Sequence, residues 1–219
     1  MINCKFCKGR CIQYGRQGHQ QRFKCKVCGK TQQAQYKKHA YGNRDLNSWI
    51  IRLIKESCST RGIARLLKIS IITVVRRIRQ IAASIVKPAI RMNLNKIEVD
   101  ELKTYIKRKS NEYWIAYALY PATGEVIDFA VGKRTKSTLK GLIETLLLAR
   151  VRKIHTDHLP VYRSLIPRAQ HRRGAYTINH IERHNLTLRT HLKRLARKTI
   201  CYSKSPRMLE ACFKIYVWG

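Results

Sequence analysis

Three carboxylates stand out because the chain has few of them. Asp and Glu number 12 against 46 Lys and Arg in 219 residues, a formal net charge of +34. Asp100 lies in the apolar run KIEVDELKTYI, Asp157 ends KIHTD, and Glu182 begins the basic segment ERHNLTLRTHLKRLAR. Mg²⁺ prefers carboxylate oxygens, and two such ions can activate the attacking oxygen and stabilise the leaving oxygen of a phosphodiester displacement. The three acids therefore indicate a site for Mg²⁺ or Mn²⁺ that acts on phosphate.

Neighbouring acids offer alternatives. Glu98 and Glu101 flank Asp100, and strand alternation is expected to point both to the opposite face, so either replaces Asp100 only if the register slips by one residue. Asp128 is the best remaining substitute. Each of the three acids also has a structural explanation, as a strand-edge residue, a helix N-cap and a first-turn residue favoured by the helix dipole, respectively. Their joint occurrence in this order favours the metal site.

Four of the eight cysteines form two C-x2-C pairs with 17 residues between them, namely Cys4, Cys7, Cys25 and Cys28. This spacing predicts a zinc ribbon, in which four thiolates complete a tetrahedral site. Disulfides are the alternative, and a cytoplasmic chain disfavours them. Cys11 or His19 could substitute for one ligand. Because four protein ligands leave no open position, the Zn²⁺ is expected to hold the module together rather than to do chemistry.

The charge of the chain predicts its partner. Basic residues occur in all regions, so self-repulsion is strong unless a polyanion is present, and double-stranded DNA is the expected one. At 44% hydrophobic residues the chain should nevertheless fold. An anionic membrane is the alternative, but there is no 18-residue apolar run, and MINCKFCKGR lacks the apolar core of a signal peptide. We expect a cytoplasmic, nucleoid-associated protein without a membrane partner.

The elements that would position these groups follow from periodicity. Apolar residues predict a first helix from Leu46, a second that ends at Leu67 and a third through Val74 and Ile81, with Thr60 and Ser70 as N-caps of the last two. This is a helix-turn-helix pattern, in which the third helix enters the major groove with its N-terminal residues. The DNA contacts expected there are Thr73, Arg76 and Arg77. A plain three-helix bundle with a solvated basic face is the alternative.

After Lys87-Pro88 the pattern changes to strands. The expected elements are strands over 97–106, 113–120 and 126–131, a helix over 138–149, a strand over 153–157, a small helix and a fifth strand before 180, a helix that carries Glu182, and a final helix from Pro206. This order is that of a ribonuclease H-like fold, in which carboxylates of the first strand, the fourth strand and a later helix converge. The expected class is thus a multidomain α+β and α/β protein, with a zinc ribbon (1–34), a helix-turn-helix domain (45–85) and a ribonuclease H-like domain (94–219).

The helix around Glu182 has two expected faces. Glu182, Asn185 and Arg189 recur at i, i+3 and i+7 and share one face. Asn185 and Arg189 could then orient Glu182 or contact a DNA phosphate. Lys193 and Arg194 extend the basic character of this segment and are expected to follow the DNA backbone.

Taken together, these features resemble a transposase of the insertion sequence 1 family. The features that carry the resemblance are the ribbon, the helix-turn-helix, the strand-borne Asp100 and Asp157, and the motif E-R-x-N-x-x-L-R over 182–189, in a match that runs from Cys4 to the terminal KIYVWG. The resemblance implies a prokaryotic DDE recombinase in which Asp100, Asp157 and Glu182 hold two Mg²⁺ ions. It would bind terminal inverted repeats and join them to target DNA, as at least a homodimer because two ends must be paired.

Two other functions would explain part of the chain. A zinc-ribbon and helix-turn-helix regulator would bind DNA without cleavage, but it would leave the three acids without a task. A ribonuclease H-like structure-specific nuclease would cleave DNA without strand transfer. A hydroxyl nucleophile such as Tyr162 or Tyr202 is an alternative chemistry, although no pattern singles out either residue.

Overall fold

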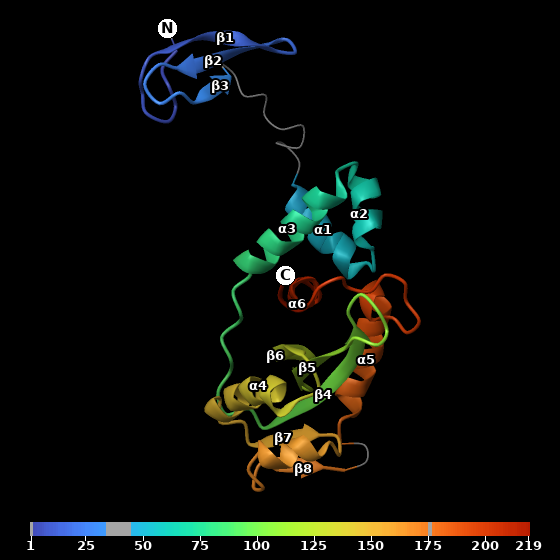
Figure 1. The fold of residues 1–219 in the computed structure, drawn as a ribbon. Helices are drawn as coiled ribbons and strands as arrows, with labels where there is room; N and C mark the ends of the chain where they lie inside the picture. Colours follow the sequence, from blue (N-terminus) through green and yellow to red (C-terminus); the bar gives the residue numbers. More distant parts are fainter. Residues whose placement is uncertain (1, 34–44, 175–176) are drawn as a thin grey trace. The chain divides into compact units, whose positions relative to one another are not determined.

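Two separate sheets organise the chain (Figure 1). The computed structural model describes residues 2–33, 45–174 and 177–219, and the chain divides into two compact units, residues 1–44 and 45–219. The first unit is a three-stranded antiparallel sheet in the order β1 (Cys11–Gln17), β2 (Gln20–Cys25) and β3 (Thr31–Gln33). A tight turn joins β1 to β2, and Gly18 adopts φ +58° there, a conformation that glycine tolerates well.

Three helices begin the second unit, as the periodicity predicted. They are α1 (Leu46–Lys55), α2 (Thr60–Leu67) and α3 (Ile71–Ser84), packed around Ile50, Ile63, Val74 and Ile78. Ser70 caps α3 as expected, since its side chain accepts the N–H of Thr73. The predicted cap of α2 was one residue off. Ser59 accepts the N–H of Gly62, and Thr60 is the first helical residue.

A five-stranded mixed sheet forms the centre of this unit. Its strands are β4 (Lys96–Tyr105), β5 (Glu112–Tyr120), β6 (Glu125–Gly132), β7 (Lys153–Thr156) and β8 (His171–Arg173), in the order β6-β5-β4-β7-β8. The first three form an antiparallel meander, whereas β7 pairs parallel to β4, and β8 parallel to β7. The predicted strands therefore exist within a few residues of their expected positions.

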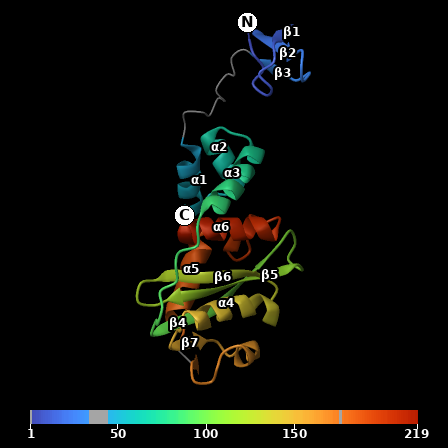
Figure 2. The same cartoon turned by 90° about the vertical axis from the view of Figure 1, so that its left-hand side faces the viewer.

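Helices cover both faces of this sheet (Figure 2). On one face, α4 (Lys136–Leu148) places its stripe of Leu139, Leu142, Ile143 and Leu146 on a core that includes Val99 and Ala118. On the other face lie α5 (Asn179–His191) and α6 (Pro206–Trp218), and Phe213 of α6 packs on Tyr117 and Phe129. Because β5 is covered on both sides, its sequence is a continuous apolar and aromatic run rather than an alternating one.

The three-helix segment is part of the same compact unit as the large sheet. Lys55 Nζ at the end of α1 donates to the carbonyl of Gly219 at 2.6 Å, and Lys87 forms an ion pair with Asp128 at 2.7 Å. Asp128, the substitute acid considered above, is therefore engaged by Lys87. The division at residues 85 and 94 remains a prediction, and both positions lie inside the second unit. No helix among the described residues is long and apolar enough to span a membrane.

Candidate active site

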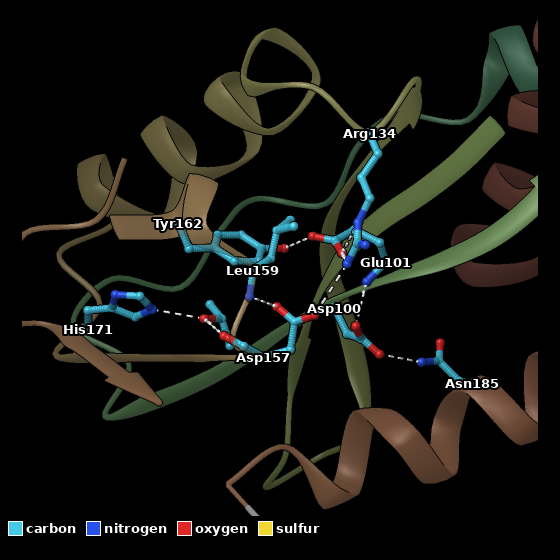
Figure 3. Close-up of polar contacts among 9 residues, drawn as sticks. Asp100, Glu101, Arg134, Asp157, Leu159, Tyr162, His171 and Asn185 are labelled. Atoms are coloured by element: carbon cyan, nitrogen blue, oxygen red, sulfur yellow. Dashed lines mark hydrogen bonds and ion pairs between the residues drawn. The ribbon is translucent and has the colours of Figure 1, made fainter. Parts of the chain in front are cut away.

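The acid cluster forms where β7 ends beside β4. Val99 pairs with Thr156 in the parallel register, so the next residues, Asp100 and Asp157, lie next to each other. With Glu101, each offers one carboxylate oxygen, and these three oxygens all lie within 4.8 Å of one another (Figure 3). The sequence predicted that Asp100 and Asp157 would converge, and the structure brings them together.

Glu101 was not expected in this cluster. It does point to the opposite face from Asp100, as strand alternation requires. However, β7 pairs with β4 only as far as Val99, and the next backbone bridge, between Ile106 and Ser203, comes seven residues later. In the described chain, β4 therefore has no strand partner on that side next to Asp100 and Glu101. Side chains from both faces can therefore meet Asp157 at the open edge. A strand that ends early is a tertiary feature, and the alternation within β4 gives no sign of it.

Asp100 is fixed by hydrogen bonds from two directions. Its Oδ1 accepts the N–H of Glu101 at 2.8 Å, and its Oδ2 accepts from the amide of Asn185 at 2.7 Å. Burial, reinforced by the neighbouring carboxylates of Glu101 and Asp157, raises the pKa of Asp100 to about 6. The cluster thus holds negative charge at a cost that a cation would relieve.

A buried tyrosine orients Asn185. The hydroxyl of Tyr117 donates to Asn185 Oδ1 at 2.8 Å, while Asn185 Nδ2 donates to Asp100. An ionised carboxylate can only accept, and this requirement fixes the orientation of the amide. Asn185 was expected to orient Glu182 or to contact DNA, but in the structure it positions Asp100. Its contact with DNA remains a prediction.

Glu98 lies on the same face as Asp100, and the expectation that it would face the opposite way was wrong because residues two apart share a face. Its fully buried carboxylate accepts from Ile181 N at 2.9 Å, His180 Nδ1 at 2.9 Å and Lys96 Nζ at 2.8 Å. Burial alone would raise the pKa of Glu98, but these donors outweigh it and lower the pKa. Glu98 thus accepts a backbone N–H in the first turn of α5, where the N-cap residue Ile178 makes no side-chain hydrogen bond.

Two contacts hold α5 along β4. Glu98 binds Ile181 and Asp100 binds Asn185, so two residues of strand match four residues of helix. The spacings agree, since two strand residues span about 6.8 Å and four helical residues about 6 Å. The N-terminal half of α5 is therefore fixed beside the acid cluster.

Glu182 lies on α5 but outside the cluster. It is exposed in the first turn, three residues before Asn185, and its side chain has no hydrogen bond or ion pair with any described residue. The structure brings Asp100 and Asp157 together with Glu101 and not with Glu182. The assignment of Glu182 as the third catalytic acid therefore remains a prediction.

The basic residues predicted near α5 differ in their contacts. Arg189 donates to the carbonyl of Leu195 at 2.9 Å, and Arg194 donates to Ser203 Oγ at 2.7 Å, so both have structural tasks. Lys193 is exposed. All three remain candidates for DNA contact, with Lys193 the least engaged within the described chain.

The helix-turn-helix residues also differ. Arg76 is exposed on α3, whereas Arg77 donates to Asn47 Oδ1 at 3.4 Å and its Nε is buried without a partner among the described residues. Thr73 lies at the start of α3, where its hydroxyl is 2.8 Å from Ser70 Oγ. Of the three predicted DNA contacts, Arg76 is the most available, and all three remain predictions.

The four paired cysteines, Cys4, Cys7, Cys25 and Cys28, form a second cluster. The Sγ atoms of Cys4 and Cys28 are 3.6 Å apart, and those of Cys7 and Cys25 are 3.4 Å apart. A disulfide requires about 2.05 Å, so these thiols are free. Cys11 is buried nearby, with its Sγ 3.9 Å from the carbonyl of Gly9, and lies outside the cluster, as does His19.

Backbone N–H groups stabilise two of these thiolates. Burial raises the pKa of Cys4, but the N–H groups of Cys7 and Phe6 outweigh it and bring the pKa to about 6. The N–H of Cys28, followed by that of Val27, lowers the pKa of Cys25. The pKa of Cys7 moves the other way: the N–H of Gly9 lowers it, but the thiols of Cys25 and Cys28 outweigh this and raise it to about 12. Four sulfur donors are the ligands that a soft cation prefers, and they bind it as thiolates.

Carboxylates gathered at one edge of a mixed α/β sheet, in a chain of charge +34, are typical of an enzyme that acts on nucleic acid. The family model described as IS1 transposase matches residues 94–217, and the chain belongs to this family. It is a transposase, and thus a DNA-processing enzyme.

Named relatives agree with the family. The chain is 35% identical over 120 residues to Insertion element iso-IS1n protein InsB of Shigella dysenteriae, a match that covers 55% of this chain and 92% of the relative. It is 38% identical over 120 residues to Insertion element IS1 protein InsB of Shigella flexneri, with the same coverage. Among solved structures, a chain of a simian T-cell lymphotropic virus intasome in complex with PP2A regulatory subunit B56 gamma is 17% identical, with a TM-score of 0.36. That match covers 64% of this chain and 59% of the other, and at this TM-score it supports no conclusion.

Proposed function

We propose that the chain is a DDE-type transposase that binds the terminal inverted repeats of its element, cleaves the DNA there and joins the freed end to target DNA. The observation that carries this proposal is the convergence of Asp100 and Asp157, two acids far apart in sequence, at an open edge of the sheet. The three-stranded meander followed by parallel strands supports a ribonuclease H-like fold for residues 94–219. The activity would take place at the nucleoid of a prokaryotic cell.

The acid cluster fits Mg²⁺ or Mn²⁺. All of its donors are carboxylate oxygens, and an arginine already lies between two of the acids as a cation would. Asp100 and Asp157 would hold two ions together with Glu182, which α5 carries next to Asn185. Such ions, when bound, activate the attacking hydroxyl and stabilise the leaving oxygen.

The residues of the chain perform the positioning. Asn185 holds one oxygen of Asp100 and leaves the other to the N–H of Glu101, so the carboxylate cannot rotate away. Glu98 holds the first turn of α5, the helix that carries Glu182. Asp157 is kept at the end of β7 because its Oδ1 accepts the N–H of Leu159 at 2.9 Å. Orientation before reaction is worth several kcal/mol of barrier in general.

The cysteine cluster is proposed as a structural Zn²⁺ site. In the described part of the first unit, the buried residues are Cys4, Cys11, Cys25 and Gln32, with Phe23 packed against the cysteines. A core of this size rarely supports a fold without a disulfide or a metal, and the thiols are free. The ribbon, Arg76 on α3 and the basic residues after α5 would then bind DNA. Pairing of two element ends would require at least a homodimer.

The test is a strand-transfer assay. Wild-type protein, Asp157→Asn, Glu182→Ala and the exposed control Glu144→Gln would receive a pre-cut duplex copied from the end of the element, a plasmid target, and Mg²⁺ or Mn²⁺. Joined product from wild type and the control alone would support the proposal. Binding without cleavage would favour a regulator, and cleavage without joining would favour a nuclease. Full joining by Glu182→Ala would remove Glu182 from the set of catalytic acids.

A further inference from the structure

One basic side chain reaches into the acid cluster. Arg134 lies in the connection between β6 and α4, directly before Thr135, the N-cap of α4. Its Nη2 is 3.0 Å from Glu101 Oε2 and 3.4 Å from Asp157 Oδ2, and its Nε is 3.3 Å from Glu101 Oε2 (Figure 3). Among the described residues, no other basic side chain forms an ion pair with a member of the cluster.

The guanidinium of Arg134 is held in one plane and has donors left over. Glu101 binds one edge through two contacts, and the ring of Trp114 lies under the group, 4.6 Å from Cζ to the ring centroid. Its Nη1 has no hydrogen-bond partner within the described part of the chain, and 36% of the side chain is exposed. An arginine fixed on three sides thus presents a free edge to solvent beside the acids.

Glu101 differs from the two aspartates. Only 1% of its side chain is exposed, against 31% for Asp157. Its Oε1 accepts the hydroxyl of Tyr162, which is fully buried, and its Oε2 accepts from Arg134. Protein donors also reach both oxygens of Asp157, from Leu159 N and Arg134 Nη2. The two acids therefore differ in exposure: Glu101 is enclosed by protein, whereas the carboxylate of Asp157 is partly open to solvent.

We propose that Arg134 is a catalytic residue that binds a phosphate oxygen of the DNA at the acid cluster, and that Glu101 is its positioning residue rather than a metal ligand. This inference rests on the proposed function. The planar fork of arginine suits phosphate, and its charge-assisted hydrogen bonds are strong. The contact with Asp157 is the longest hydrogen bond that Arg134 makes, so it would be given up first if Asp157 held a cation.

The structural alternative is that Arg134 only neutralises a buried glutamate. In that case a lysine at this position would serve nearly as well as arginine, because one ammonium can pair with one carboxylate. The free Nη1 edge and the location between two cluster members favour the phosphate role. The two explanations differ in what happens to DNA binding, which can be measured without any reaction.

The experiment compares Arg134→Lys, Glu101→Gln, their double variant and Asp157→Asn, with Lys136→Gln as a control for the loss of one nearby charge. Lys136 is an exposed residue of the first turn of α4. DNA affinity is measured by fluorescence anisotropy on the pre-cut element end, with Ca²⁺ or with no added divalent cation. Ca²⁺ is used because it is expected to occupy the oxygen site without supporting joining. Binding of Mn²⁺ is measured separately by the shift in thermal unfolding, and strand transfer is assayed with Mn²⁺.

We expect Arg134→Lys and Glu101→Gln each to lose about ten- to one-hundred-fold in DNA affinity with Ca²⁺, as for loss of a hydrogen bond to a charged group. The double variant should be no worse than either single one, because both disable the same contact. The Mn²⁺ shift should persist in both single variants and be lost in Asp157→Asn. Thermal unfolding identifies any variant that fails to fold, and Arg134→Lys keeps the charge that Glu101 needs.

Three results would overturn the inference. DNA affinity of Arg134→Lys equal to that of wild type or Lys136→Gln would make Arg134 structural. Loss of the Mn²⁺ shift in a folded Glu101→Gln protein would make Glu101 a metal ligand. Additive losses of DNA affinity in the double variant would mean that Arg134 and Glu101 act independently. If wild type gave neither a Mn²⁺ shift nor joined product, the proposed function itself would fail, which is a different outcome from an active wild type beside an unaffected Arg134→Lys.

Discussion

Replacement of Asp100 by asparagine should stabilise the metal-free protein and abolish strand transfer. Burial and two neighbouring carboxylates raise the pKa of Asp100 from its ordinary 3.8 to about 6. One unit of pKa corresponds to about 1.4 kcal/mol, so ionisation of Asp100 at neutral pH costs the folded chain up to about 3 kcal/mol. Asparagine has a similar shape, carries no charge and avoids this cost. However, its amide nitrogen cannot accept the second of the two hydrogen bonds that Asp100 accepts, so the net gain should stay below about 3 kcal/mol.

The sign of the pH dependence follows from the raised pKa. Between pH 3.8 and about 6 the folded chain binds more protons at Asp100 than the unfolded chain does. The stability contributed by protonated Asp100 is therefore fully present below pH 3.8 and is lost as the pH rises through about 6. The advantage of Asp100→Asn should be large at about pH 7.5 and smaller at about pH 5.

Bound divalent metal should reverse the order of stability of wild type and Asp100→Asn. A cation that binds only the folded wild type adds about 2.7 kcal/mol at a concentration one hundred times its Kd. Asp100→Asn loses a ligand and should gain much less. Wild type should then match or exceed the variant in stability when Mn²⁺ saturates the site.

The assay is urea unfolding followed by tryptophan fluorescence at both pH values, with and without added Mn²⁺. Glu144→Gln is the control, because Glu144 is an exposed acid on α4 whose ion pair with Lys140 at 3.6 Å should contribute little. A variant no more stable than wild type at about pH 7.5 without metal would refute the reasoning. So would an advantage that does not shrink at about pH 5.

Three further predictions concern the supports of the site and the DNA contacts. Asn185→Ala should reduce strand transfer at least tenfold, because Asp100 loses a charge-assisted hydrogen bond of about 1.5–3 kcal/mol. The control Thr190→Ala, at an exposed residue of the same helix, should not reduce strand transfer when assayed in parallel. In urea melts at neutral pH, Glu98→Gln should lower the free energy of unfolding by about 2–4 kcal/mol. This loss should shrink as the pH falls below 4.5, because the lowered pKa of Glu98 gives the wild type stability that is lost on acidification. Arg76→Ala should weaken DNA binding and flatten its salt dependence without changing the midpoint of thermal unfolding. Arg77→Ala should lower this midpoint, because Arg77 contacts Asn47. Equal midpoints for the two variants would contradict this difference between Arg76 and Arg77.

Much of the fold could be predicted because its signals are local. The apolar stripe of α4, the cap at Ser70 and the alternating or continuous apolar runs of β4 to β6 depend on residues a few positions apart. The C-x2-C pairs likewise carry their own geometry. Asp100 and Asp157 could be singled out because acids are scarce in this chain and both lie in strands or at their ends.

The remaining features depend on contacts between distant segments. Glu101 joins the acids only because β7 ends at Thr156 and leaves the edge of β4 open, and no pattern within β4 records where another strand stops. Arg134 is one of 46 basic residues, and only the path of the chain between β6 and α4 distinguishes it. In the sequence, nothing distinguishes Glu98 from other acids in strands, because its contact with the N–H of Ile181 depends on where α5 packs. The sequence by itself determined the elements and the types of chemistry available, whereas the tertiary structure decided which side chains meet, because long-range packing sets distances that local periodicity does not encode.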